Sequence, residues 1–121
     1  MRITRVGDHG HLVVTRLSGN GGYDPGTVDA KRERDLTPAE WKRVEDAIAA
    51  ASFDTTATEG AMGNDGAQWI IERAKPGAYR LVERWSPTYD AASAAKNAAF
   101  VRACDLFLDL AGRDLVTGDV Y

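Results

Sequence analysis

Short stretches of alternating hydrophobic and polar residues recur along the chain, and turn-forming residues separate them. Alternation of this kind places every second side chain on the same face of a β-strand. In the first third of the chain it predicts strands over residues 2–6, 11–17 and 27–34, with residues 7–10 forming the first turn. We therefore expect the chain to begin with a meander of two or three antiparallel strands.

The strongest alternation lies in the middle of the chain and predicts a β-hairpin with a tryptophan on each strand. The two strands are expected over residues 68–73 and 79–85, joined by a Pro-Gly turn at residues 76–77. If this pair forms the centre of the turn, Trp69 lies opposite Arg84, whereas a loop one residue longer changes the register. The sequence leaves both registers open.

A well-marked helix start follows the first strands. Thr37 is expected to be the N-cap residue, Glu40 completes a capping box with it, and a helix is predicted over residues 38–51. Leu36 can pack on Trp41 as a hydrophobic staple. The apolar residues of this segment recur at helical spacing, so one side of the helix is expected to pack and the other to face water.

A second helix is predicted after the hairpin, beginning between Ala91 and Ala95 and ending at Gly112, and residues 115–121 predict a short last strand. These elements, in the order β-β-β-α-β-β-α, predict an α+β fold. We expect an antiparallel sheet of about five strands with both helices packed mainly on one face. The whole chain, residues 1–121, is expected to form a single domain.

Charge and cysteine content limit the class of partner. With a formal net charge of −3 and a pI near 5.3, the chain is not expected to bind nucleic acid or an anionic membrane. It has no transmembrane run and no signal-peptide pattern, so we expect a cytoplasmic protein, or an exported one if Met1 is not the native start. The single cysteine, Cys104, excludes an internal disulfide and is typical of a reducing compartment.

No set of residues with catalytic or metal-binding spacing stands out. His9 and His11 form an H-x-H pair whose imidazoles would share a strand face, but that face offers no third ligand. Cys104 lies on the apolar stripe of the predicted second helix, where a thiol is normally an inert core residue. We therefore predict no metal, no cofactor and no catalytic residue, and lean towards a protein that is not an enzyme.

Three acids lie close in sequence to the tryptophans of the hairpin: Asp65, Glu72 and Glu83. Paired carboxylates beside aromatic side chains are typical of glycosidases. The sequence does not place two of them around a substrate, and surface ion pairs are the favoured interpretation. In either register Glu72, Glu83, Arg80 and Arg84 project from a ladder of apolar residues, which suggests cross-strand ion pairs on its wetter face.

The aromatic residues and the longest loop suggest where a partner would bind. Trp85 and Tyr89, at the end of the hairpin, are expected at the surface, whereas Trp41 and Trp69 are expected in the core. Residues 54–66 form the longest irregular segment, and long loops in compact domains are often functional. The predicted binding residues are Trp85, Tyr89, Asp65 and Asn64.

The segments L-T-P-A-E-W, D-G-A-Q-W-I-I-E and Y-R-L-V-E-R-W-S-P form a combined pattern over residues 36–112. It resembles a loose group of small, uncharacterised bacterial proteins with a D-G-x-x-W-x-x-E hairpin followed by R-W-S-P. The resemblance implies that Glu72 and Arg84 are paired and that the tryptophans hold the hairpin to the helices. It implies no substrate. The matching residues are Asp65, Gly66, Trp69, Glu72, Arg84, Trp85, Ser86 and Pro87.

The combined observations favour a non-catalytic domain that binds another protein, specifically a small bacterial inhibitor or immunity-type protein. Two alternatives stay open. One is a small hydrolase or carbohydrate-active domain that uses paired carboxylates, and the other is an envelope-associated structural module. The partner's identity and the oligomeric state are not defined by the sequence.

Overall fold

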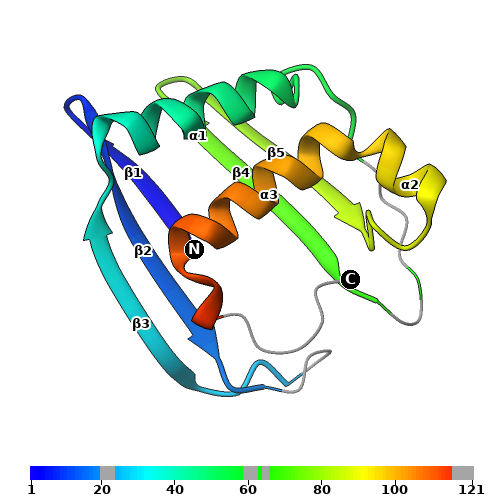
Figure 1. Cartoon of the computed structure of the whole chain (residues 1–121), viewed down its shortest axis with the longest axis horizontal. Coiled ribbons are helices and arrows are strands. Elements are labelled where there is room, and N and C mark those ends of the chain that lie inside the picture. Colours follow the sequence, from blue (N-terminus) through cyan, green and yellow to red (C-terminus); the bar gives the residue numbers. More distant parts are fainter. Residues whose placement is uncertain (20–23, 59–62, 64–65, 116–121) are drawn as a thin grey trace. The chain divides into compact units, whose positions relative to one another are not determined.

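The computed structural model describes residues 1–19, 24–58, 63 and 66–115 (Figure 1). Within these residues it contains five β-strands, three α-helices and one 3-10 helix. The strands are β1 (Arg2–Val6), β2 (His9–Leu17), β3 (Val28–Asp35), β4 (Gln68–Lys75) and β5 (Ala78–Trp85), and the helices are α1 (Pro38–Ala50), α2 (Ala91–Lys96), α3 (Ala98–Ala111) and η1 (Arg113–Leu115).

The fold is α+β with antiparallel strands, as the sequence predicts. The described strands form two sheets rather than one: a three-stranded sheet of order β1-β2-β3 and a two-stranded sheet of β4 and β5. The described residues divide into two compact units: Met1–Val44 with residues 107–115, and Glu45–Leu106. No helix in the described part of the chain is long and apolar enough to cross a membrane.

In the first unit, the central strand β2 carries a buried face. Leu12 and Val14 are buried and alternate with less buried neighbours, as expected for a strand with one packed side. Gly10 continues this face, and a β-carbon at Gly10 would come within 2.9 Å of both Ile3 and Trp41. The missing side chain at Gly10 therefore lets the start of α1 approach the sheet closely.

The start of α1 has the capping box that the sequence predicts. The Glu40 N–H donates to Thr37 Oγ1 at 3.2 Å, and the Thr37 N–H donates to Glu40 Oε2 at 2.8 Å. The same carboxylate accepts two hydrogen bonds from Arg34, at 2.9 and 3.0 Å. Arg34 also donates to the carbonyl oxygen of Leu110 near the end of α3. Glu40 and Arg34 thus connect β3, the start of α1 and the end of α3.

In the second unit, β4 and β5 form a hairpin around a two-residue loop of Pro76 and Gly77. Gly77 has a φ of +74°, in the left-handed region that favours glycine. Trp69 lies opposite Arg84, so the turn selects the register expected for a two-residue loop.

The predicted second helix is divided in two. α2 begins at Ala91, within the predicted range, and ends before Asn97, where φ is −98° and ψ is 9°. α3 then begins at Ala98. The predicted last strand falls mostly on residues 116–121, which lie outside the described residues, and Leu115 belongs to the 3-10 helix.

Glu40→Gln is expected to lower the free energy of unfolding by about 1 kcal/mol at pH 7, because an amide cannot form the charge-assisted pair with Arg34. The hydrogen bonds from Arg34, followed by the backbone bond from Thr37, lower the pKa of Glu40 from 4.5 to about 2. A carboxyl group with a lowered pKa in the folded state stabilises the protein above its unfolded pKa, and this contribution is lost as the pH falls through the folded pKa. Urea unfolding should therefore show the wild type losing its advantage over the variant between about pH 4.5 and 2.

Glu33→Gln is the matched control, because Glu33 is an exposed carboxylate on β3 that pairs with Lys31 at the surface. This change should leave the stability at pH 7 nearly unchanged. Equal losses in the two variants would contradict the structural role of Glu40.

Candidate binding surface

The β4–β5 hairpin has two faces of different character, because side chains alternate along each strand. The inner face consists of Trp69, Ile71, Arg73 and Lys75 on β4 with Ala78, Arg80, Val82 and Arg84 on β5. The open face consists of Gln68, Ile70, Glu72 and Ala74 on β4 with Tyr79, Leu81, Glu83 and Trp85 on β5. Ile71 and Val82, at the centre of the inner face, are 5% and 0% exposed.

The inner face contains a buried charged side chain, Arg84, which is 7% exposed. Its Nε donates to Asn97 Oδ1 at 2.9 Å, and its Nη1 donates to the Glu83 carbonyl oxygen at 2.8 Å. The guanidinium carbon lies 5.6 Å from the centre of the Phe100 ring, within the range of a cation–π interaction. The Asn97 amide in turn donates to the Ser93 carbonyl oxygen at 3.0 Å. Arg84 therefore joins the hairpin to the junction between α2 and α3.

The expected ion pair between Glu72 and Arg84 does not fit this register. Glu72 lies opposite Leu81 on the open face, whereas Arg84 lies opposite Trp69 on the inner face. The expectation came from the resemblance, and the two-residue turn sends these two side chains to opposite sides of the hairpin. Glu72 instead forms a hydrogen bond with Tyr79, which raises the pKa of the Tyr79 hydroxyl.

The end of the hairpin opposite the turn is closed by Ser86. Its φ of +37° is rare for a residue with a side chain. The Ser86 N–H donates to the Ala67 carbonyl oxygen at 2.8 Å, and its hydroxyl accepts from the Ala67 N–H at 3.1 Å. Gly66 has a φ of +137°, and a β-carbon there would overlap Ser86 Oγ. With Pro87 fully buried, these contacts explain the glycine and the Ser-Pro of the hairpin pattern.

The segment that follows α1 packs along β5. The Arg80 guanidinium donates to the carbonyl oxygen of Phe53 at 3.2 Å and to that of Thr56. The backbone N–H of Glu83 donates to Thr58 Oγ1 at 3.2 Å. Phe53 is 1% exposed, so this segment is also anchored by a core side chain.

The open face carries large apolar side chains that reach solvent. Ile70 is 48% exposed and Tyr79 is 64% exposed, while Leu81 and Trp85 are half-buried. Ile70 and Leu81 are diagonal neighbours across the strands, so their side chains are close enough to act together. Aromatic and aliphatic groups on a rigid two-stranded ladder are suitable anchors for a protein partner.

Two of the four predicted binding residues lie in the described part of the chain. Tyr89 is 84% exposed, as the sequence predicts. Trp85 is half-buried, and β-carbons at Gly63 and Gly66 would meet its indole ring, so these glycines lie against it. The other two are Asn64 and Asp65, which lie outside the described residues.

Sequence reasoning did not identify Ile70 and Tyr79 as the exposed pair. The alternation carries this information, because neighbouring residues of a strand point to opposite faces. Ile70 therefore faces away from the side on which Ile71 is buried. Trp41 and Trp69, expected in the core, are half-buried.

The carboxylates that a hydrolase would use lie on the open face or outside the described residues. Glu72 and Glu83 are diagonal neighbours on the open face, where Glu83 accepts a hydrogen bond from Gln68 at 2.7 Å. Neither lines the two concave sites near the hairpin turn. Asp65 lies outside the described residues.

The histidines are each bonded to a neighbouring acid. His9 Nδ1 lies 3.2 Å from Asp8, and His11 Nδ1 lies 2.8 Å from Asp35. Among the residues that the structure describes, no group of three or more His, Cys, Asp or Glu side chains could hold a metal ion. Burial raises the pKa of the Cys104 thiol to about 12, so it stays protonated at neutral pH.

Comparison of the chain with protein-family models, with curated proteins and with solved structures found no match.

Asn97→Ala is expected to lower the free energy of unfolding by about 2–3 kcal/mol, because it removes the acceptor of a buried Arg84 N–H group. Urea unfolding followed by tryptophan fluorescence measures the loss. Asn97→Asp keeps an oxygen acceptor for Arg84 but loses the donor to the Ser93 carbonyl oxygen, so it should recover only part of the lost stability.

Gln68→Ala is the control for this experiment, because it removes an exposed amide from the open face. Its effect should stay within about 0.5 kcal/mol. A loss from Asn97→Ala no larger than that of the control would contradict the importance of the Arg84–Asn97 bond.

Proposed function

We propose that the protein is a non-catalytic binding domain that recognises another protein through the open face of the β4–β5 hairpin. The observation that carries the proposal is the exposure of Ile70 and Tyr79 on one face of a regular ladder. Burying such side chains against a partner stabilises the complex by about 25 cal/mol for each Å² of apolar surface removed from water. Arg84 and Ser86 hold the hairpin in place beforehand, so less ordering entropy is lost on binding.

The charges on the open face define what the partner must offer. The Glu72 and Glu83 carboxylates lie among the apolar side chains of this face. A wholly apolar partner would strip them of water without replacing the lost hydrogen bonds, which is unfavourable. We therefore expect a partner with an apolar centre bordered by arginine, lysine or other hydrogen-bond donors.

A small bacterial inhibitor or immunity-type protein is the specific form of this function that we propose. Such a protein acts by covering a partner's surface, and this requires a preformed face rather than a reactive group. We place the binding in the cytoplasm, because a single cysteine is typical of a reducing compartment.

Affinity capture of the tagged protein from a lysate of its source organism should recover one partner near one-to-one stoichiometry. The double variant Ile70→Ser with Tyr79→Ser should bind that partner at least about tenfold more weakly, because central anchors contribute 2 kcal/mol or more to an interface. Isothermal titration calorimetry with the purified partner measures the change in Kd.

Val28→Ser is the matched control, because Val28 is an apolar residue on β3 that is 62% exposed. Tyr89→Ser tests whether the segment after β5 contributes to the affinity for the partner. Full binding by the double variant would show that the open face is not the interface. The absence of any partner with a Kd below the millimolar range would count against a binding function altogether.

A further inference from the structure

The inner face of the hairpin has a concentration of positive charge near its turn. Arg73 and Arg80 lie directly opposite each other, and Lys75 follows two residues after Arg73 on the same face. Like charges at directly opposite positions destabilise a pair of strands. The arrangement is unusual in a chain whose net charge is −3, and it favours an anion nearby.

The Asp54 carboxylate is one anion close to these cations. It lies 3.1 Å from Lys75 Nζ and 3.1 Å from Arg73 Nη1, and the bond with Lys75 is the main cause that lowers the pKa of Asp54. Arg80 donates instead to two backbone carbonyl oxygens, which are neutral. Three positive charges are therefore arranged around one bound carboxylate.

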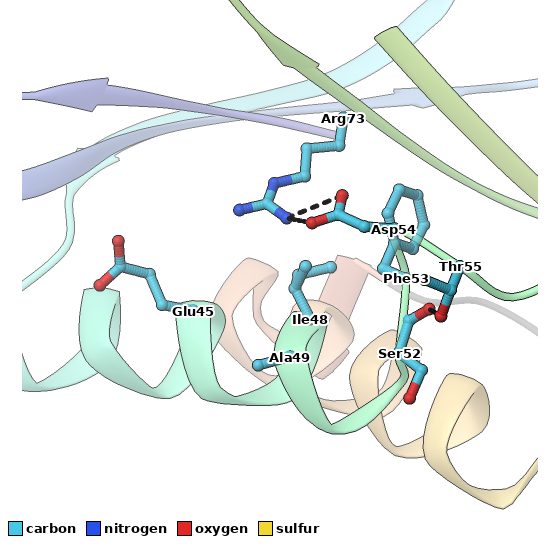
Figure 2. A pocket seen from close by; sticks show the side chains of 8 residues that line it. All are labelled: Glu45, Ile48, Ala49, Ser52, Phe53, Asp54, Thr55 and Arg73. Atoms are coloured by element: carbon cyan, nitrogen blue, oxygen red, sulfur yellow. Dashed lines mark hydrogen bonds and ion pairs between the residues drawn. The ribbon is translucent and has the colours of Figure 1, made fainter. Parts of the chain in front are cut away.

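These side chains line two concave sites that share Asp54 and Arg73. One has a volume of about 340 Å³ and extends along the end of α1, and the other, of about 250 Å³, reaches Lys75 and Arg80. Figure 2 shows the first site, with the Arg73 guanidinium directed at Asp54 and the Glu45 carboxylate turned away from it. The first site alone is at the lower end of the size range of small-ligand sites.

We propose that this cationic cleft, lined by Asp54, Arg73, Lys75 and Arg80, binds a small molecule with two or more phosphoryl or carboxylate groups. A guanidinium presents paired N–H donors that match two oxygens of either group. Lys75 adds a mobile point charge that can follow a second anionic group. The three cations lie on the inner face, and Tyr79, which also lines one of the two sites, belongs to the open face, so the cleft adjoins the proposed protein-binding surface.

In this proposal the Asp54 carboxylate competes with the ligand for Arg73 and Lys75. It occupies both side chains when no ligand is bound. Replacing Asp54 by asparagine should therefore free both cations and increase the affinity for an added anion. A cluster with only a structural role predicts a different result: Asp54→Asn would weaken the fold without any gain in anion binding.

The test is a titration of the ¹⁵N-labelled protein with inorganic pyrophosphate, followed by amide chemical shifts, with a sodium chloride titration at matched ionic strength. We expect saturable shifts centred on residues 54, 73, 75 and 80. Lys75→Gln should weaken the binding about tenfold, because one charge-assisted bond is lost, and Asp54→Asn should strengthen it about tenfold. Citrate, titrated in parallel, shows whether carboxylate groups serve as well as phosphoryl groups.

Arg2→Gln is the matched control, because it removes one positive charge from an exposed position on β1. It should leave the pyrophosphate affinity unchanged. The proposal fails if sodium chloride reproduces the shifts, if Arg2→Gln weakens binding as much as Lys75→Gln, or if Asp54→Asn brings no gain in affinity. Lys75→Gln is preferred to a change at Arg80, because Arg80 also holds the segment after α1 in place.

Discussion

The buried guanidinium of Arg84 is the constraint on which the second unit depends. A charged group removed from water is unfavourable by several kcal/mol unless hydrogen bonds within the protein replace those of the solvent. Around Arg84 this compensation comes from the amide oxygen of Asn97, a backbone carbonyl oxygen and the ring of Phe100. The break between α2 and α3 falls at the residue that accepts from Arg84. The helix break and the hairpin register are thus parts of one arrangement.

Several residues of the hairpin pattern shape the end of the hairpin. Gly66 permits the close approach of the chain, Ser86 closes the ladder, and Pro87 is packed beneath it. Arg84 of the same pattern holds the inner face against the helices. Glu72 and Trp85 of the same pattern lie on the open face instead, so the pattern contributes to both faces of the hairpin.

Local signals predicted local structure well, since a capping box and a Pro-Gly turn act within a few residues. The break at Asn97 could not be predicted in this way, because its partner Arg84 lies 13 residues earlier. The expected pairing of Glu72 with Arg84 does not fit the register, because opposite charges on two strands do not show on which face each side chain lies. The exposure of Ile70 follows from the alternation only once the register is known. The cluster around Asp54 joins the segment after α1 to Arg73 and Lys75 of β4, about twenty residues later, so no short pattern marks it.

The contacts along β5 also bear on how the chain meets copies of itself. An unpaired strand edge is a template to which a strand of another molecule can add. Here Thr58 Oγ1 accepts the backbone N–H of Glu83, and the Arg80 side chain holds the same segment through the carbonyl oxygens of Phe53 and Thr56. A substitution that released this segment would free the Glu83 N–H for a strand of another molecule and so favour intermolecular β-pairing and aggregation.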